Sequence, residues 1–302
     1  MINKPKYNKT EKCLVCKDNN LQPLLFGYSR FNPKLFHRIA ICKNCGHIQQ
    51  YPLFKKEEYA IINDKFFGQK YLADGNLNID NNAKKLRKIE NDLSSYIQDG
   101  LQVLDVGPGE TWAMDYFIKS KCKYSAIEHS DKLSSSIRDR GGNVIGKSIF
   151  DDYSKYESKF DIIIFRHVLE HLLNPKEGLH ALKKLLSLDG LIYLALPNSS
   201  NPGLKKGFRT SYIRPVHISY FCEENVVRLA NSAGLFSIHS KSDAEIVCLL
   251  KHGVGESSNS NYFERQKKVF IMKSKQSLIK DYYKIIRDIP KYLLKTIIGK
   301  LS

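Results

Sequence analysis

The chain has 302 residues, of which 42% are hydrophobic, so it is long enough for one ordinary α/β core with roughly a hundred residues left for smaller modules. Lys and Arg number 48 against 31 Asp and Glu, and the resulting formal net charge of +17 suggests an anionic partner. No apolar run approaches the roughly 18 residues of a membrane span, and the polar start MINKPKYNKTEK lacks the apolar region of a signal peptide, so we expect a cytoplasmic protein.

Two CxxC pairs stand near the start of the chain, Cys13-Leu-Val-Cys16 and Cys42-Lys-Asn-Cys45, with 25 residues between the inner cysteines. Each pair can supply two thiolates to one tetrahedral ion from a tight turn. Redox CxxC motifs normally lie where a strand meets a helix, whereas these pairs lie in a short, turn-rich stretch. We therefore predict a zinc-binding module over residues 1–60, in which Zn²⁺ is structural because no coordination position stays open.

The predicted catalytic domain, residues 61–255, shows a helix-like stretch at 81–96 and then a short apolar strand at 101–106 that carries Asp105 near its end. The turn Gly107-Pro108-Gly109 follows, and a helix is expected from Trp112. Glycines at that place let a ligand approach the backbone closely, because any Cβ would obstruct it. The full GxGxxG fingerprint is missing, since Trp112 stands at the position of the third glycine, and this argues against NAD or FAD.

A second strand is predicted at 123–127 and ends in Glu128. An acidic side chain at that place of a βαβ unit can accept both hydroxyls of a ribose. A third strand is expected at 142–145, and the segment after it would bring the apolar Phe150 and the acidic Asp151 near the adenine attached to such a ribose.

The fourth strand, 160–165, is almost fully apolar, as in a parallel strand that is buried on both faces. A helix is expected at 174–186, and a turn at 187–190 leads into a fifth strand at 191–196. Strands that alternate with helices predict a Rossmann-like, doubly wound and mostly parallel α/β sheet, whose ligands bind at the carboxyl edge.

Five segments in this order resemble the class I S-adenosylmethionine-dependent methyltransferases: VLDVGPG, AIEHS, FDIIIFRHVLEHLLNP, LKKLLSLDGLIYLALPN and RPVHISYFCEENVVRLANSAGL. With the four-cysteine module, the chain is similar to bacterial enzymes that methylate nucleotide sugars or surface polysaccharides. The resemblance implies that the glycine turn holds the methionine part of the cofactor, the end of the second strand binds ribose, and the residues after the fourth strand approach the sulfonium. Carried over by position, these residues are Asp105, Gly107, Gly109, Glu128, Arg166 and His167.

Methyl transfer to a sugar hydroxyl needs a base for the hydroxyl proton, and histidine suits this task because its pKa lies near working pH. His167, directly after the fourth strand, is expected on the cofactor side, with a packed turn residue as the alternative. His171 is a candidate base or a hydrogen-bonded cap. His217 lies past the fifth strand in a segment expected to cover the acceptor, and we choose it as the base over a structural histidine that anchors the loop.

The tail, residues 256–302, is strongly basic: from Glu264 to Ser302 eleven Lys and Arg stand against three Asp and Glu. Two amphipathic helices are predicted, separated by Pro290 and with lysines opposite the apolar side. The apolar face of the first would contain Leu278, Tyr282, Ile285, Ile286 and Ile289. Such a tail either docks on the catalytic domain, forms a homodimer interface, or binds an anionic membrane surface, which would place the protein at the inner face of the membrane.

We expect an enzyme that methylates a carbohydrate or glycan intermediate, by O-methylation with a histidine base and with S-adenosylmethionine as the donor. RNA is a less favoured acceptor, because zinc ribbons and basic surfaces suit phosphate backbones but the core shows no clustered aromatic and basic platform. A non-catalytic binding protein that has kept the fold is a third alternative. The intact glycine turn and Glu128 argue against it.

Overall fold

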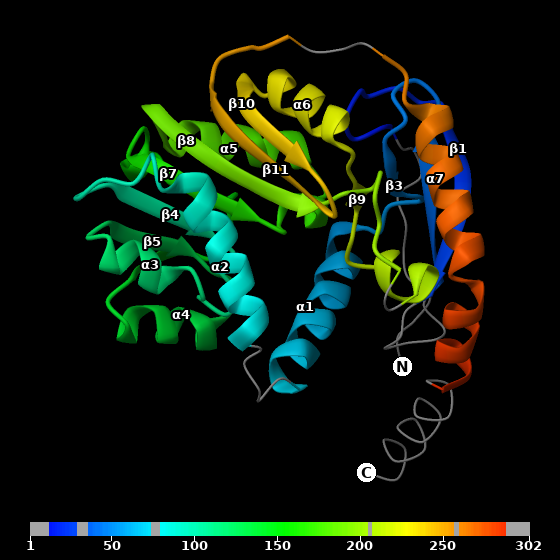
Figure 1. The fold of residues 1–302 in the computed structure, drawn as a ribbon, viewed down its shortest axis with the longest axis horizontal. Coiled ribbons are helices and arrows are strands. Elements are labelled where there is room, and N and C mark those ends of the chain that lie inside the picture. Colours follow the sequence, from blue (N-terminus) through cyan, green and yellow to red (C-terminus); the bar gives the residue numbers. More distant parts are fainter. Residues whose placement is uncertain (1–11, 29–35, 74–78, 205–206, 257–259, 288–302) are drawn as a thin grey trace.

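Two sheets organise the chain in the computed structural model, a seven-stranded one and a four-stranded one (Figure 1). The structure describes residues 12–28, 36–73, 79–204, 207–256 and 260–287. The larger sheet and its helices contain the predicted ligand site, and the smaller sheet adjoins the four cysteines of the CxxC pairs.

The strands of the larger sheet are β4 (Gln102–Val106), β5 (Lys123–Ile127), β6 (Asn143–Gly146), β7 (Phe160–Arg166), β8 (Leu186–Pro197), β10 (Leu235–Ser242) and β11 (Glu245–His252). Their order is β10-β11-β8-β7-β4-β5-β6. All neighbours from β8 to β6 are parallel, whereas β11 runs antiparallel to both β8 and β10. The connections reverse direction between β4 and β7, so a ligand crevice is expected at the carboxyl ends of these strands. The predicted Rossmann-like, mostly parallel sheet is thus confirmed.

Helices cover both faces of the larger sheet, and they are α2 (Ile79–Leu93), α3 (Met114–Lys119), α4 (Asp131–Asp139), α5 (Pro175–Leu185) and α6 (Glu223–Ser232). Side chains alternate along β7, as strand geometry requires. Ile162 and Ile164 pack in one apolar cluster with α2, α3 and α4, while Ile163 and Phe165 pack in another with α5 and α6. This two-sided burial explains why the strand is almost continuously apolar.

Among the boundaries that differ from the predicted ones are the starts of β8 and α3. Strand β8 already begins at Leu186, which pairs with Phe160, and the next pair is Leu191 with Ile162. Residues 187–190 therefore loop out of the ladder where the sequence predicts a turn before the strand. Helix α3 begins at Met114, two residues later than predicted.

The smaller sheet has the order β1 (Leu21–Tyr28), β2 (Phe36–Cys42), β3 (Ile48–Gln50) and β9 (Ser219–Tyr220), and all its pairs are antiparallel. Strand β9 comes from far downstream, with Tyr220 opposite Ile48. Helix α1 (Lys56–Ala73) runs across residue 60, where the sequence places the end of the module. The division into 1–60, 61–255 and 256–302 stays a prediction, and α1 and β9 link its first two parts.

The tail begins with α7 (Phe263–Gln276), which lies along the smaller sheet beside β1 (Figure 1). Phe270 of α7 is fully buried in a cluster with Ile39 and Ile41 of β2. In the described residues the tail therefore docks on the smaller sheet, and Arg265 of α7 also forms an ion pair with Glu224 of α6. Helical residues continue at 278–287 after a turn at Ser277, and the predicted helix beyond Pro290 lies outside the described residues.

The face of the tail that is buried differs from the predicted apolar face. Leu278, Tyr282 and Ile286 are 60%, 67% and 51% exposed, whereas the polar residues Ser277 and Asp281 are buried. The Asp281 carboxylate accepts hydrogen bonds from successive backbone N–H groups at the start of a short π-helix, Phe208–Tyr212. Capping these N–H groups outweighs apolar burial on this side of the helix. Within the described ranges, no helix combines the length and the apolar character that crossing a bilayer demands.

Candidate active site and cysteine cluster

The glycine turn after β4 lies against the segment after β7. Gly107 and Gly109 have φ angles of +68° and +59°, in the left-handed region that favours glycine. The Gly107 N–H donates to Ile127 O at 2.9 Å, which ties the turn to the end of β5. A Cβ on Gly107 would meet Val168 Cγ2 at 3.0 Å. The turn therefore contacts the segment that the resemblance places at the sulfonium.

Glu128 lies beside the glycine turn, where the sequence predicts a ribose-binding carboxylate. Its side chain is buried, and the carboxylate accepts hydrogen bonds from the backbone N–H groups of Ser130, at 2.8 Å, and Gly109. Burial raises the pKa of Glu128, although these two donors act in the opposite direction. A carboxylate held next to a turn with two glycines fits the ribose and methionine parts of S-adenosylmethionine.

Asp105, at the end of β4, is 5% exposed and faces the neighbouring strand β5. The Tyr124 hydroxyl donates to Asp105 Oδ2 at 2.9 Å. Burial raises the pKa of Asp105 to about 7, and the hydrogen bond from Tyr124 opposes this rise. Asp105 is thus held by β5, and its predicted contact with the cofactor stays a prediction.

Phe150 and Asp151 lie in the loop after β6. The Phe150 side chain is 54% exposed, and Asp151 Oδ2 accepts hydrogen bonds from the backbone N–H groups of Lys147, at 3.1 Å, and Ser148, at 3.0 Å. The carboxylate therefore orders its own loop. Both residues line a surface hollow together with His180 of α5. Their predicted place near the adenine stays a prediction.

Arg166 and His167, at the end of β7, share a carboxylate from β11. Glu245 Oε1 accepts hydrogen bonds from the Arg166 guanidinium at 2.5 Å and from His167 Nε2 at 2.6 Å. The Arg166 guanidinium also lies over the Trp112 ring, 5.5 Å from its centroid. Burial alone would lower the pKa of His167, but Glu170 and Glu245 raise it above its ordinary value. His167 itself has a φ of +55°, which turns the chain sharply after the strand.

Glu170, His171 and His217 form a cluster next to His167. The Glu170 side chain is 2% exposed, and its Oε1 lies 3.3 Å from His167 Nδ1 and 3.9 Å from His171 Nε2. The rings of His171 and His217 meet edge to face, with centroids 5.0 Å apart. Burial, followed by the nearby charges of His171 and Arg214, lowers the pKa of His217 well below its ordinary value, so its imidazole is neutral at pH 7. The structure thus brings together the three histidines predicted as candidate bases.

Several hydrogen bonds tie the segment after β8 to this cluster. The Tyr59 hydroxyl of α1 lies 2.7 Å from His171 O and 2.8 Å from Val216 O. His171 Nδ1 donates to Val216 O at 2.7 Å, and the Ile218 N–H donates to Glu170 O at 2.8 Å. The backbone on either side of His217 is therefore fixed against the segment after β7.

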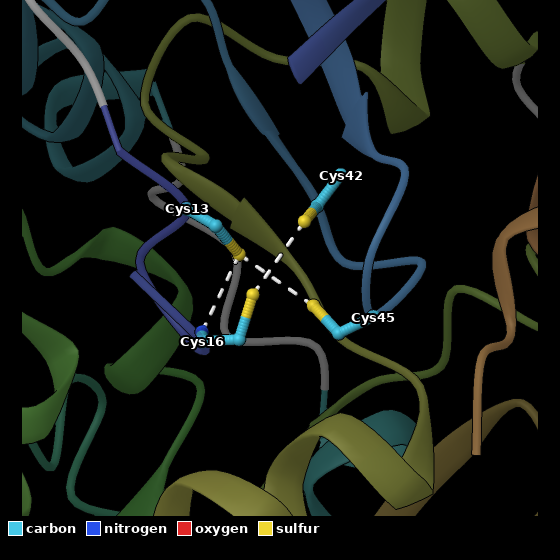
Figure 2. Close-up of side chains that lie close together, drawn as sticks. All are labelled: Cys13, Cys16, Cys42 and Cys45. Carbon is cyan, nitrogen blue, oxygen red and sulfur yellow. Dashed lines mark hydrogen bonds between the residues drawn. The ribbon is translucent and has the colours of Figure 1, made fainter. Parts of the chain in front are cut away.

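The four cysteines of the CxxC pairs converge on one point (Figure 2). The Sγ atoms of Cys13 and Cys45 are 3.6 Å apart, those of Cys16 and Cys42 are 3.5 Å apart, and all four lie within 4.8 Å of one another. Thiolates on a tetrahedral zinc ion, with Zn–S bonds of about 2.3 Å, are separated by about 3.8 Å. None of the four is in a disulfide. The cluster therefore fits one zinc ion with four protein ligands.

Two turns of the same shape present these cysteines. The Lys17 N–H donates to Cys13 O at 2.9 Å, and the Gly46 N–H donates to Cys42 O at 2.8 Å. Lys17 and Gly46 both have positive φ angles, +64° and +72°. A Cβ on Gly46 would meet the backbone carbonyl carbon of Tyr262 at 2.5 Å, so the close approach of the segment before α7 requires glycine there.

The cysteine cluster also contacts the larger sheet's helices. Asn225 of α6 is buried, and its Nδ2 donates to Cys45 O at 3.1 Å. Cys13 and Cys45 belong to the same apolar cluster as Phe221, which precedes α6. The cysteine turns therefore pack against the chain that follows His217.

Three residues of the site have little or no signal in the sequence. Glu170 stands three residues after His167 and directly before His171, and this spacing is the one local signal that could have found it. Glu245 comes from β11, and Tyr59 comes from the predicted zinc module. Neither belongs to a motif, so only the tertiary structure places them at the site.

These features define a class of protein, a Rossmann-like α/β domain whose glycine turn and acidic second-strand residue adjoin a buried histidine cluster. Residues 79–240, more than half of the chain, match the family described as a methyltransferase domain, and the chain belongs to this family. It is therefore an enzyme, an S-adenosylmethionine-dependent methyltransferase that acts on an acceptor substrate. No curated protein matches the chain by sequence.

Solved structures are similar to this chain in fold. A 1,6-didemethyltoxoflavin-N1-methyltransferase from Burkholderia thailandensis, solved with 1,6-didemethyltoxoflavin and S-adenosylhomocysteine, is 17% identical and has a TM-score of 0.53. The match covers 78% of this chain and all of that one. An S-adenosylmethionine-dependent methyltransferase from Aquifex aeolicus is 18% identical over 55% of this chain and 96% of its own, with a TM-score of 0.44. At these identities the likeness concerns the fold and does not define the acceptor.

Proposed function

We propose that this enzyme transfers the methyl group of S-adenosylmethionine to a hydroxyl of a carbohydrate, either a nucleotide sugar or a glycan intermediate. The observation that carries the proposal is the close approach of Gly107 and Val168. It joins the cofactor side, with Glu128, to the cluster of Glu170, His171 and His217. The net charge of +17 supports an acceptor that carries phosphate or another anionic group.

S-adenosylmethionine supplies a methyl group on an activated sulfonium, so the protein mainly aligns donor and acceptor. We assign the ribose to Glu128 and the methionine part to the glycine turn with Asp105 behind it. The loop of Phe150 and Asp151 is assigned to the adenine. Arg166 and His167 hold the segment next to the sulfonium through their shared partner, Glu245.

The acceptor hydroxyl must lose its proton, and the histidine cluster offers the groups for this step. Both ring nitrogens of His167 face carboxylates. His171 donates from Nδ1 to Val216 O. The imidazole of His217 contacts the rings of His171 and Tyr220, and it is in the neutral form that accepts a proton, although its lowered pKa makes it a weaker base than an ordinary histidine. We therefore keep His217 as the residue that removes the proton, a role that contributes about 10²- to 10⁴-fold in rate.

We propose further that the cysteine cluster holds one structural zinc ion, which stabilises the smaller sheet. The pairing of β3 with β9 and the bond from Asn225 to Cys45 support this role, because both connect the cysteine turns to the chain around His217. Zinc would thus affect catalysis by positioning the chain around His217, and it would take no part in the methyl transfer itself.

For the tail we propose contact with an anionic membrane surface. The supporting observation is a set of exposed apolar side chains on the helical segment 278–287, namely Leu278, Ile279, Tyr282, Tyr283 and Ile286. Apolar side chains among lysines are typical of interfacial helices. The protein should co-sediment with vesicles that contain phosphatidylglycerol, and Ile279→Glu should abolish this binding. If the protein instead has the mass of a dimer in the absence of vesicles, and the same substitution makes it a monomer, these exposed apolar side chains form a homodimer interface.

The acceptor can be identified with S-adenosylmethionine that carries a labelled methyl group. Purified enzyme is incubated separately with nucleotide sugars, surface polysaccharide, glycan lipids and RNA from the same cells. We expect label in carbohydrate, as an O-methyl group by NMR spectroscopy. Label in RNA alone, or no transfer by a protein that binds S-adenosylhomocysteine, would overturn the proposed acceptor.

A further inference from the structure

The Glu170 carboxylate is buried without a hydrogen bond. Its side chain is 2% exposed, and neither Oε1 nor Oε2 has a hydrogen-bond partner among the described residues. The nearest cationic groups are ring nitrogens, His167 Nδ1 at 3.3 Å and His171 Nε2 at 3.9 Å. His167 already binds Glu245 through its other nitrogen. His167 faces Oε1 through a long contact, whereas Oε2 is left as a buried carboxylate oxygen to which a further cation can bind.

Two imidazoles stand beside this carboxylate at the spacing of metal ligands. One ligand atom each from Glu170, His171 and His217 lies within 4.8 Å of the other two. His171 Nδ1 donates to Val216 O at 2.7 Å, so the proton is on Nδ1 and Nε2 carries a lone pair. A backbone carbonyl that orients a ring in this way is the usual outer partner of a metal-bound histidine.

We propose that Glu170, His171 and His217 bind one divalent transition-metal cation, at a site distinct from the cysteine cluster. Two imidazoles and one carboxylate suit ions such as Mn²⁺, Fe²⁺ or Zn²⁺ and leave coordination positions for oxygen ligands. Hydroxyl oxygens of the acceptor would occupy these positions, and the charge of the cation would lower the pKa of a bound hydroxyl, whose proton would pass to solvent water because His217 is here a metal ligand and not the base. This role toward the acceptor rests on the proposed function, whereas cation binding does not.

The location of the three residues supports this role. Glu170 and His171 follow Val168, which contacts the glycine turn, and His217 comes from the segment after β8. Tyr59 fixes the backbone of both segments through His171 O and Val216 O. Rigid support of this kind holds ligands at a set spacing before the ion arrives.

Mn²⁺ is the probe of choice, because its free form gives an EPR signal that decreases on binding and because thiolate sites prefer zinc. The full-length protein, with zinc in its cysteine cluster, is titrated with Mn²⁺ in the presence of S-adenosylhomocysteine. We expect one Mn²⁺ per chain. Glu170→Gln and His217→Ala should weaken binding at least tenfold, and the surface variant His239→Ala should bind as the wild type does.

No stoichiometric binding by the wild-type protein, or full binding by both cluster variants, would overturn the site. If the buried substitutions prevent folding, imidazole NMR signals of the wild type decide instead. Mn²⁺ should broaden those of His167, His171 and His217 much more than that of His239, and equal broadening of all four, or of none, contradicts the proposal. An enzyme that methylates carbohydrate without binding Mn²⁺ keeps its proposed function, with His217 as a direct base. If the enzyme binds Mn²⁺ but methylates no carbohydrate, the cation site is supported and the proposed acceptor is wrong.

Discussion

Glu245 Oε1 lies 2.6 Å from His167 Nε2, although 78 residues separate the two in the chain. Strand β11 runs antiparallel to β8, with Glu245 opposite Pro197, and β8 in turn lies beside β7. The same carboxylate accepts a hydrogen bond from Arg166 and lies 3.5 Å from Lys88 Nζ of α2. An antiparallel strand at the side of the sheet thus fixes the residues at the carboxyl end of a central parallel strand.

Glu245→Gln should lower the free energy of unfolding by about 2–4 kcal/mol at pH 5, because it leaves the partly buried Arg166 and His167 without their counter-charge. Burial by itself would raise the pKa of Glu245, but His167 and Arg166 hold it at about 2. Since this pKa is lower than in the unfolded chain, the stabilisation is present above about pH 4.5 and is lost as the pH falls toward 2. Urea unfolding at pH 5 and pH 2.5 measures the difference. Exposed Glu57→Gln is the control, and an equal loss at both pH values would contradict the assignment.

Without cofactor, the stability of the Asp105→Asn variant relative to the wild type should be greater at pH 8 than at pH 5. Burial raises the folded-state pKa of Asp105 to about 7, so the wild type loses stability as the pH rises from about 4 through 7, when a buried charge forms. The neutral amide avoids this loss. The difference in unfolding free energy between variant and wild type should increase by about 1–3 kcal/mol between the two pH values. An unchanged difference would mean that Asp105 is already ionised at pH 5.

Glu128→Ala should weaken S-adenosylhomocysteine binding by about 10- to 100-fold, since charged hydrogen bonds to the ribose contribute about 1.5–3 kcal/mol. Calorimetry measures the affinity, with a stoichiometry near one for the wild type. Exposed Glu57→Ala, outside the assigned cofactor site, serves as the control. No binding by the wild-type protein would overturn the whole cofactor assignment.

Cys45→Ser should lower the zinc content by one ion per chain, because it removes one of the four ligands at the cysteine cluster. Metal analysis of protein purified without chelator measures the content, and hydrogen exchange should become faster in β2 and β3. Cys122→Ser, outside the cluster, should keep its zinc. Full zinc content in Cys45→Ser would rule out this site.

His217→Ala should lower kcat at least tenfold and leave the affinity for S-adenosylhomocysteine within about twofold, whether His217 acts directly as a base or holds a cation. His239→Ala should have no effect on either quantity. Joint loss of cofactor affinity and thermal stability would show instead that His217 is a structural anchor of the loop between β8 and α6.

Much of the site is encoded in short, contiguous patterns. The two CxxC pairs, the glycine turn and Glu128 at the end of the second strand are each recognisable from a few neighbouring residues, because the local backbone geometry determines what they can do. The apolar run of β7 predicts a buried central strand for the same reason. The fold class followed from the order of these patterns, and it is confirmed by the order of the strands.

Long-range partners were decided only by the tertiary structure. Neither the sequence around Glu245 nor that around Tyr59 contains a motif, and their places depend on which strands and helices pack together. The tail shows the limit most clearly: its amphipathic pattern predicts a buried apolar face, yet the buried residues include Asp281, which caps the backbone of Phe208–Tyr212. A periodic pattern records which residues share a side of a helix, but the free energy of satisfying buried N–H groups on a distant segment determines which side is covered.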